Sequence, residues 1–371
     1  MRRALDEAQS ALGSTSPNPS VGAVLVRDGR IVGRGHTQPP GGPHAEVMAL
    51  RDAGTSARGA TLYCTLEPCV HTGRTGPCTE AIIEAGVAAV HYAILDPDTQ
   101  VSGAGDARLR AAGVDVKAGD GAAESTRVLE GYLKHRRTGS PTAIVKVAMS
   151  LDGRIAAASG DSRWVSSAEA REWVHHLRTQ VDAVIIGSGT LLADDPALTA
   201  RPGGTAEGAH QPARLVIDSQ ARTQPSARLL TETGGPAIIA TVEGVSTTWR
   251  AAIEARGGEV LVVPAEAGVD GVGRVSLSAL LAALGERGML NVLVEGGGVL
   301  LGALFDQRLV DRLYAVIAPV VVGAAAAPSA VSGRGAQVMR EAPRLRDLAV
   351  TRLGEDVLVE GVPVWPDATA D

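Results

Sequence analysis

The first part of this chain has to bring together one histidine and two cysteines that lie far apart in the sequence. His44 is followed two residues later by Glu46, and Cys69 and Cys78 come further on, each directly after a proline. Imidazole nitrogen and thiolate sulfur are ligands that Zn²⁺ prefers, and a catalytic zinc site keeps one position open for water. The sequence therefore predicts His44, Cys69 and Cys78 as metal ligands. Glu46 would remain free as the catalytic general acid/base.

The order of these residues is typical of zinc deaminases, which carry His-x-Glu, then Pro-Cys, then a last Cys. Here nine positions separate Cys69 from Cys78, so a loop has to join the two thiolates. One alternative is a surface histidine with two cysteines that are ordinary buried residues. Another is a zinc-stabilised binding module, but this would need a fourth protein ligand. Cys64 fits a buried strand position better than that role.

Length and composition limit the remaining possibilities. A chain of 371 residues exceeds the usual size of one core, so two domains are expected. The net charge of −6, the pI near 5.8 and the 2% of aromatic residues argue against a nucleic-acid partner. Three cysteines form no paired disulfide framework, which indicates a reducing compartment.

Neither the N-terminal residues nor the uncharged stretch 313–333 suggests export or a membrane span. The N-terminus reaches Asp6 and Glu7 before any apolar run, unlike a signal peptide. The uncharged stretch 313–333 is interrupted by Pro319, so we expect a buried strand at Val320–Val322 rather than a spanning helix. We therefore expect a cytoplasmic protein with no membrane partner.

The first half alternates between strand and helix patterns, which indicates a layered α/β domain. Asp28-Gly29 predicts a hairpin turn. Helices are expected at 4–13, 44–52, from Pro68, at 78–85 and at 121–138, and strands at 21–26, 30–32, 61–66 and 89–95. The turn-rich segment 138–141 is the predicted domain boundary.

The second half restarts the alternation after this boundary. Ser166 and Ser167 with Glu169 predict a capped helix that ends near Thr179. A further two helices are expected at 277–284 and 299–307, and strands at 143–148, 181–186, 214–217, 237–240, 260–263 and 291–295, with an edge strand at 357–364.

Three segments of this half carry polar groups at strand ends. Glu295 and the three glycines after it lie between a strand and a helix, where backbone N–H groups can approach a phosphate. The segments 146–153 and 194–201 combine lysine, serine, aspartate and arginine. Each of the three could equally be an ordinary turn.

Taken together, the ordered motifs resemble the bifunctional deaminase–reductase family of riboflavin biosynthesis. In the first half these are 17–19, 44–46, 67–69, 73–75 and Cys78, and in the second half 150–156, 162–166, 193–199 and 293–297. The resemblance covers about residues 2–365. It implies a cytidine-deaminase-like three-layer α/β/α domain at 1–140 and a dihydrofolate-reductase-like α/β domain at 141–371.

The resemblance also implies the chemistry. The first domain would remove the 2-amino group of 2,5-diamino-6-ribosylamino-4(3H)-pyrimidinone 5′-phosphate with Zn²⁺. The second would use NADPH to reduce the ribosyl group, giving 5-amino-6-(5-phospho-D-ribitylamino)uracil. The expected partners are this phosphorylated pyrimidine and further copies of the chain as a homo-oligomer. A tRNA- or base-editing deaminase would share the zinc site but should carry a basic, aromatic-bearing groove.

Carried over residue by residue, the family's zinc ligands and proton shuttle fall on the four residues already named. Its substrate contacts fall on Asn18, Ser162, Arg178, Leu198, Arg201 and Glu295, and its NADP contacts on Ala148, Trp164, Thr190, Asp194, Ser219, Gly297 and Gly298. In one departure, Thr37 occupies the position where the family commonly has a histidine, and His36 lies one residue earlier.

Overall fold

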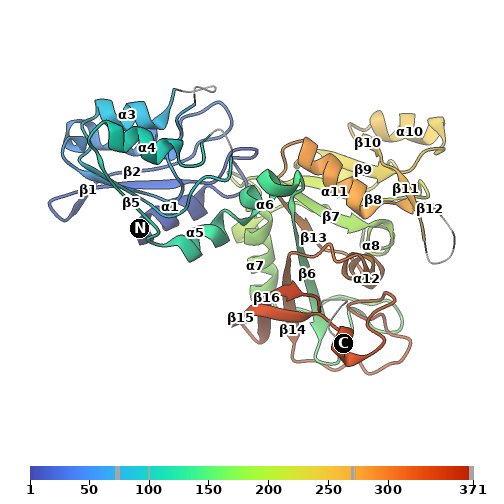
Figure 1. The fold of residues 1–371 in the computed structure, drawn as a ribbon. Coiled ribbons are helices and arrows are strands. Elements are labelled where there is room, and N and C mark those ends of the chain that lie inside the picture. Colours follow the sequence, from blue (N-terminus) through green and yellow to red (C-terminus); the bar gives the residue numbers. More distant parts are fainter. Residues whose placement is uncertain (72–75, 99–100, 269–270, 272, 367–371) are drawn as a thin grey trace. The chain divides into compact units, whose positions relative to one another are not determined.

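The computed structural model describes residues 1–71, 76–98, 101–268, 271 and 273–366. The chain divides into two compact units, Met1–Ser140 and Pro141–Asp371 (Figure 1). The motif 73–75 and the last five residues of the predicted second domain lie outside the described residues.

The first unit is built on a five-stranded sheet with the order β2-β1-β3-β4-β5. Its strands are β1 (Gly22–Arg27), β2 (Arg30–His36), β3 (Thr61–Cys64), β4 (Ala89–Tyr92) and β5 (Asp115–Ala118). β1 runs antiparallel to β2 and β3, and the rest of the sheet is parallel. The predicted hairpin is confirmed. Asp28 and Gly29 both have positive φ, as a two-residue hairpin turn of this hand requires.

Helices cover both faces of this sheet. They are α1 (Arg2–Ser10), α2 (Ala45–Ala53), α3 (Cys78–Glu84), α4 (Ala104–Ala111), α5 (Ala122–Val128) and α6 (Glu130–Thr138), with a 3-10 turn, η1 (Gly54–Ala57). A Cβ on Gly22 would lie 1.9 Å from the Ala4 carbonyl oxygen of α1, and one on Gly35 would lie 2.5 Å from the Ala49 nitrogen of α2. Gly22 and Gly35 face opposite sides of the paired strands, so the unit has the expected three-layer α/β/α arrangement.

Some expectations for this unit are wrong. No helix begins at Pro68, because residues 67–70 are irregular and α3 starts only at Cys78. The helix expected at 121–138 breaks at Leu129 into α5 and α6, and the helix expected at 4–13 ends at Ser10. α4 and β5 were not predicted, because each is short and buries a single large apolar residue, Leu109 in α4 and Val116 in β5.

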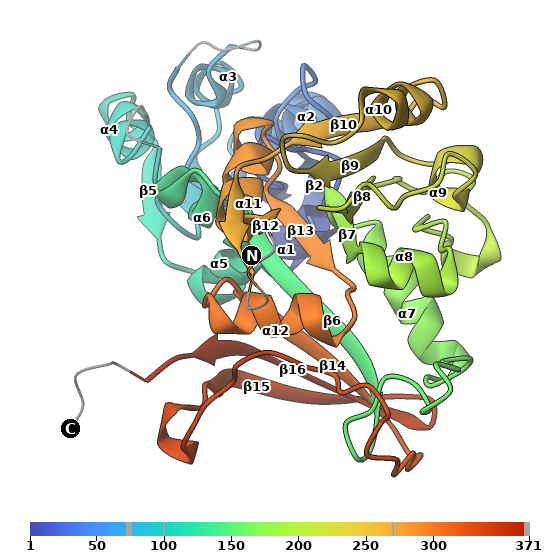
Figure 2. The same cartoon turned by 90° about the vertical axis from the view of Figure 1, so that its right-hand side faces the viewer.

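The second unit contains a nine-stranded sheet with the order β10-β9-β8-β7-β13-β6-β14-β16-β15. Its strands are β6 (Thr142–Ser150), β7 (Ala183–Gly187), β8 (Ala213–Ile217), β9 (Ala237–Thr241), β10 (Glu259–Val262), β13 (Asn291–Val294), β14 (Arg312–Ala318), β15 (Arg344–Leu353) and β16 (Asp356–Val364). β10 to β14 in this order are parallel, and β16 and β15 add antiparallel strands at one edge, seen together in Figure 2. β11 (Ala265–Ala267) and β12 (Gly273–Val275) form a separate pair.

Helices flank this sheet on both faces. They are α7 (Ala168–Arg178), α8 (Ser188–Asp194), α9 (Arg228–Thr231), α10 (Thr247–Glu254), α11 (Leu277–Glu286) and α12 (Gly298–Asp306), with 3-10 turns η2 (Pro202–Gly204) and η3 (Met339–Glu341). Along β7, Ile185 belongs to one hydrophobic core and Ile186 to the other. This two-sided burial explains why the parallel strands read as continuous apolar runs. The predicted cap of α7 is confirmed, because the Ala170 N–H donates to Ser167 Oγ.

Two strand predictions in this unit are wrong. The tail strand β16 is not at the edge, since it lies between β14 and β15. β15 was missed because arginines interrupt its apolar pattern. The strand expected at Val320–Val322 does not form: β14 ends at Ala318, before Pro319, and Val321 is 66% exposed. Among the described residues, no helix has both the length and the apolar character needed to cross a membrane.

Candidate active sites

In the first unit, the predicted metal ligands lie together. His44 Nδ1 is 3.5 Å from Cys69 Sγ and 3.3 Å from Cys78 Sγ, and all three donor atoms lie within 4.8 Å of one another. His44 is the N-cap of α2, Cys78 is the first residue of α3, and Cys69 follows β3 in an irregular segment. Two helix N-termini therefore meet a loop. The positive ends of these helices favour thiolates.

The electrostatics of this cluster suit a cation. The hydrogen bond to Cys78 lowers the pKa of Cys69, and the same contact raises the pKa of Cys78. The hydrogen bond to Cys69 raises the pKa of His44. The Cys69 thiolate is thus stabilised by hydrogen bonds from its neighbours. A bound Zn²⁺ would stabilise the thiolates of both Cys69 and Cys78. Three donors of nitrogen and sulfur type fit zinc, and among the described residues no fourth His, Cys, Asp or Glu joins the group.

Glu46 lies in the first turn of α2 beside this cluster and is only 4% exposed. Burial, followed by the negative charge of Cys69, raises the pKa of Glu46 to about 7. An acid with this pKa can both take up and release a proton near neutral pH, as a general acid/base must.

The other first-unit residues singled out in the sequence lie outside the cluster. Cys64 is buried on β3, with its thiol 3.8 Å from the His91 carbonyl oxygen. His36 Nδ1 lies 3.2 Å from Glu7 Oε2 of α1, and the buried Thr37 accepts a hydrogen bond from the Val21 N–H.

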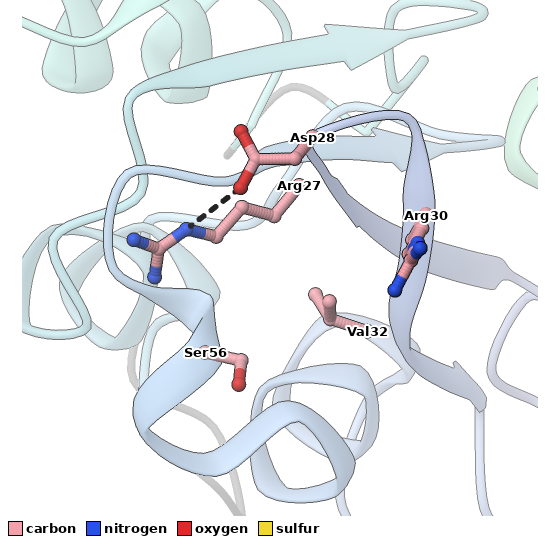
Figure 3. Close-up of a pocket in the computed structure, with 5 residues that line it drawn as sticks. All are labelled: Arg27, Asp28, Arg30, Val32 and Ser56. Carbon is pink, nitrogen blue, oxygen red and sulfur yellow. Dashed lines mark ion pairs between the residues drawn. The ribbon is translucent and has the colours of Figure 1, made fainter.

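Asn18 is half-buried and donates its backbone N–H to the Thr15 carbonyl. A shallow pocket of about 400 Å³ near the β1–β2 turn contains none of the predicted site residues (Figure 3). Its lining consists of Arg27, Asp28, Arg30, Val32 and Ser56.

In the second unit, a cleft of about 650 Å³ opens at the carboxyl ends of β6, β7 and β13. Ligands of open parallel sheets bind at this edge. Ten predicted residues line the cleft: Ala148, Ser162, Trp164, Arg178, Thr190, Asp194, Leu198, Arg201, Glu295 and Gly297.

The floor of this cleft holds a bidentate ion pair. Arg178 Nε donates to Glu295 Oε1 at 2.7 Å, and Nη2 donates to Oε2 at 3.1 Å. Burial alone would raise the pKa of Glu295, but the charge and hydrogen bonds of Arg178 hold that pKa below its ordinary value. Arg178 Nη1 donates to the Thr199 carbonyl. Arg178 is therefore largely occupied by contacts within the protein.

Arg201 is better placed for an anion. Its Nη1 donates to Thr199 Oγ1, and its Nη2 makes no hydrogen bond to any of the described residues. Its backbone N–H donates to His175 Nδ1 at 3.2 Å. His175 and Lys146 also line the cleft, and burial lowers the pKa of both. Sequence reasoning placed Lys146 at a strand end but assigned neither residue to a site.

Other predicted residues form the walls. The Gly297 N–H donates to Thr190 Oγ1, and Ser162 Oγ donates to Asp194 Oδ1 at 3.4 Å. Trp164 is 70% exposed, and the Arg171 guanidinium lies over its ring at 4.5 Å. The guanidinium covers one face of the indole, and the rest of this exposed ring offers a flat apolar surface that suits a planar ring.

Two predicted cofactor residues do not line the cleft. A Cβ on Gly298 would lie 2.2 Å from the Ser329 carbonyl oxygen, so this glycine permits close packing of α12 against that segment. Ser219 follows β8, and its hydroxyl accepts a hydrogen bond from the Val275 N–H.

The Ser150–Asp152 motif is structural. Asp152 accepts hydrogen bonds from Ser150 Oγ and from the N–H groups of Val322 and Gly323, which lower its pKa to about 2. The motif thereby ties the end of β6 to the loop after β14.

Comparisons with known proteins agree in both halves. Residues 1–94 match the family model described as the cytidine and deoxycytidylate deaminase zinc-binding region, and residues 141–359 match the RibD C-terminal domain.

Whole-length relatives extend this agreement. The riboflavin biosynthesis protein RibD of Escherichia coli K12 is 42% identical over 366 residues, covering 96% of both chains. The RibD structure from Acinetobacter baumannii (form 1) is similar with a TM-score of 0.85 and 35% identity, covering 98% of this chain and 97% of that one. A Thermotoga maritima structure described as a diaminohydroxyphosphoribosylaminopyrimidine deaminase/5-amino-6-(5-phosphoribosylamino)uracil reductase matches with a TM-score of 0.85, 32% identity and the same coverage. With a deaminase-type unit and a reductase-type unit in one chain, this protein belongs to the RibD family of riboflavin biosynthesis proteins.

Proposed function

We propose that this chain catalyses two consecutive steps of riboflavin biosynthesis. The first unit hydrolyses the 2-amino group of 2,5-diamino-6-ribosylamino-4(3H)-pyrimidinone 5′-phosphate. The second unit reduces the ribosyl side chain of the product to give 5-amino-6-(5-phospho-D-ribitylamino)uracil. The observation that carries this proposal is the cluster of His44, Cys69 and Cys78 beside the buried acid Glu46.

In the deaminase unit, His44, Cys69 and Cys78 would hold Zn²⁺. Zinc, when bound, supplies a Lewis acid that lowers the pKa of water toward ~7. Glu46 takes a proton from the attacking water and passes it to a ring nitrogen as C2 becomes tetrahedral. It then takes the proton of the new C2 hydroxyl group and gives it to the amino group, which leaves as ammonia as the C2 carbonyl forms. A pKa near 7 lets one carboxyl group perform both transfers.

In the reductase unit, the cleft would hold the pyrimidine phosphate beside NADPH. NADPH, when bound, supplies the hydride that is transferred to C1′ of the opened ribose. The planar guanidinium of Arg201 suits a phosphate, and Trp164 offers a flat wall for a ring. We assign Arg178 the role of orienting Glu295, because the two side chains bind each other bidentately.

The remaining features of the proposal concern the setting of the enzyme. We propose a cytoplasmic homo-oligomer with a small-molecule substrate and no nucleic-acid partner. The net charge of −6 supports the last point. Leu348 and Val350, both exposed on the edge strand β15, offer apolar surface to a second copy.

Cys69→Ser is expected to lose bound zinc and, with it, ammonia release from the diamino substrate. A serine hydroxyl does not provide the thiolate that the site needs. Elemental analysis and an ammonia assay measure the two effects. Cys64→Ser is the matched control, since Cys64 is buried outside the cluster, and it should retain zinc. Full zinc occupancy in Cys69→Ser would overturn the ligand assignment.

NADPH is expected to be oxidised about 10- to 100-fold more efficiently than NADH. The two cofactors differ by the 2′-phosphate of NADPH, and a hydrogen bond to a charged group contributes about 1.5–3 kcal/mol. Arg222, in the loop after β8 that also carries Ser219, is partly exposed and donates to Ser188 Oγ. If Arg222 binds the 2′-phosphate, Arg222→Gln should reduce the preference for NADPH over NADH by slowing the NADPH reaction alone. Initial rates with each cofactor and the deaminated intermediate test this, and equal efficiencies in the parent would refute the choice of NADPH.

A further inference from the structure

We propose that Glu67 is a positioning residue of the metal cluster, which fixes the Cys69 segment and the residues that cover both thiolates. This inference rests on the proposed zinc site but goes beyond it, because Glu67 touches none of the three donor atoms in the hydrogen bonds of the described residues. Glu67 lies two residues before Cys69 and is buried.

The Glu67 carboxylate is surrounded by backbone donors. Oε1 accepts from the N–H groups of Gly105 at 2.9 Å and Asp106 at 3.1 Å. Oε2 accepts from Gly103 at 3.0 Å and Asp96 at 3.3 Å. All four donors lie at least 29 positions further along the chain. One side chain therefore joins the Cys69 segment to a distant part of the sequence.

Three of these donors belong to the start of α4. Gly103 is the N-cap, and Gly105 and Asp106 are in the first helical turn. A glycine N-cap has no side chain to satisfy the first N–H groups of its helix, so another group has to do so. Glu67 supplies this cap from outside the helix, and its negative charge is favourable at the positive helix end.

The start of α4 also packs closely against the backbone of Pro68, between Glu67 and Cys69. A Cβ on Gly105 would lie only 2.1 Å from the Pro68 carbonyl oxygen. On the other side, the Cys69 carbonyl accepts hydrogen bonds from the N–H and hydroxyl of Thr79 in α3. Cys69 is thus held between α3 and α4, which lie side by side in Figure 1.

The hydrogen bonds of Glu67 also hold the segment that contains Val101, a residue that packs against both thiolates. Val101 lies in sequence between Asp96 and Gly103, two of the groups that Glu67 binds. It is buried against Cys69 and Cys78. Loss of the carboxylate would therefore loosen both the loop that presents one thiolate and the residue that shields both.

Glu67→Gln tests this role, because the amide nitrogen cannot accept the two N–H donors that one oxygen now binds. In the full chain, the dissociation constant for zinc alone, measured by chelator competition, should rise about 10- to 100-fold, as for other residues that support metal ligands. The cobalt-substituted protein should show weaker and shifted visible absorption bands. Circular dichroism should be unchanged.

Glu80→Gln is the matched control. Glu80 follows Cys78 by two positions and joins α3 to Arg108 of α4 through an exposed bidentate ion pair. The Glu80→Gln substitution removes the same charge near the cluster but leaves the contacts of the Cys69 segment intact. The zinc affinity and the cobalt spectrum should therefore remain those of the parent.

Glu67→Asp keeps the charge but shortens the reach, and it should give a smaller loss of zinc affinity. Parent-like zinc affinity and cobalt spectra in Glu67→Gln would overturn the proposal, as would metal loss that only follows loss of helicity in both variants. Zinc binding by the parent without ammonia release would contradict the proposed deaminase instead, and would leave the role of Glu67 intact.

Discussion

Glu46→Gln is expected to lower the rate of ammonia release by about 10²- to 10⁴-fold, the usual contribution of a general acid/base. Glutamine keeps the size of the side chain but cannot carry the proton. Glu46 is enclosed at the start of α2, next to Cys69 and Cys78, so no solvent-exposed carboxylate can replace it easily. Ammonia release from the diamino substrate under saturating zinc measures the effect.

The folded state should survive this substitution. Burial raises the pKa of Glu46 above its unfolded value, so its contribution to stability is present at low pH and is lost as the pH rises through about 7. In the metal-free protein at pH 8, the glutamine variant should therefore unfold at a temperature no lower than that of the parent.

Two further measurements separate the chemistry of Glu46 from general damage. Given the deaminated intermediate, Glu46→Gln should oxidise NADPH at the parent rate, because the reductase cleft lies within the second unit. Glu84→Gln, on the exposed end of α3, should leave both activities unchanged. A folded Glu46→Gln variant that lost both activities would contradict the assignment of two independent sites.

The metal cluster could be predicted because its ligands lie in short sequence motifs that can be recognised locally. His44 and Cys78 occupy helix starts that proline and composition indicate, and Asp28-Gly29 specifies the hairpin that packs against α2. The support of Cys69 could not be predicted. Pro68 suggested a helix start, but the segment is held by a carboxylate that caps a helix almost 40 positions away. Nothing in the local sequence of α4 reveals that its cap comes from Glu67.

In the second unit, too, some features could be predicted from local sequence and others could not. Apolar runs indicated its central parallel strands, which are buried on both faces. The edge was missed because β15 carries arginines and is mostly exposed, so periodicity gives little signal there. The resemblance supplied the cleft residues, but it did not give the pairing of Arg178 with Glu295 across 117 positions. That pairing makes Arg178 the partner of a buried carboxylate, which is a role in addition to the substrate contact that the resemblance implied.

Arg178→Met is expected to destabilise the second unit by about 3–5 kcal/mol and to abolish NADPH oxidation, because it leaves Glu295 buried without its bidentate partner. The two side chains are only 13% and 11% exposed. Arg287→Met provides the control, since the Arg287–Glu259 pair is far more exposed and should contribute at most about 1 kcal/mol. Denaturant unfolding of each variant gives the comparison. Equal losses in the two variants would refute the importance of the buried pair.

The double variant Arg178→Met/Glu295→Leu separates stability from function. Replacing both charges with apolar side chains of similar volume removes the uncompensated carboxylate, so most of the lost stability should return. Reductase activity should not return, because both side chains line the cleft and the substrate would still lack its polar contacts. Lys146 also loses a neighbouring carboxylate in this variant, but burial already lowers the pKa of Lys146, so this side chain can lose its proton more readily than an exposed lysine. If activity recovered together with stability, the ion pair would serve the fold alone, and Glu295 could not be a substrate contact.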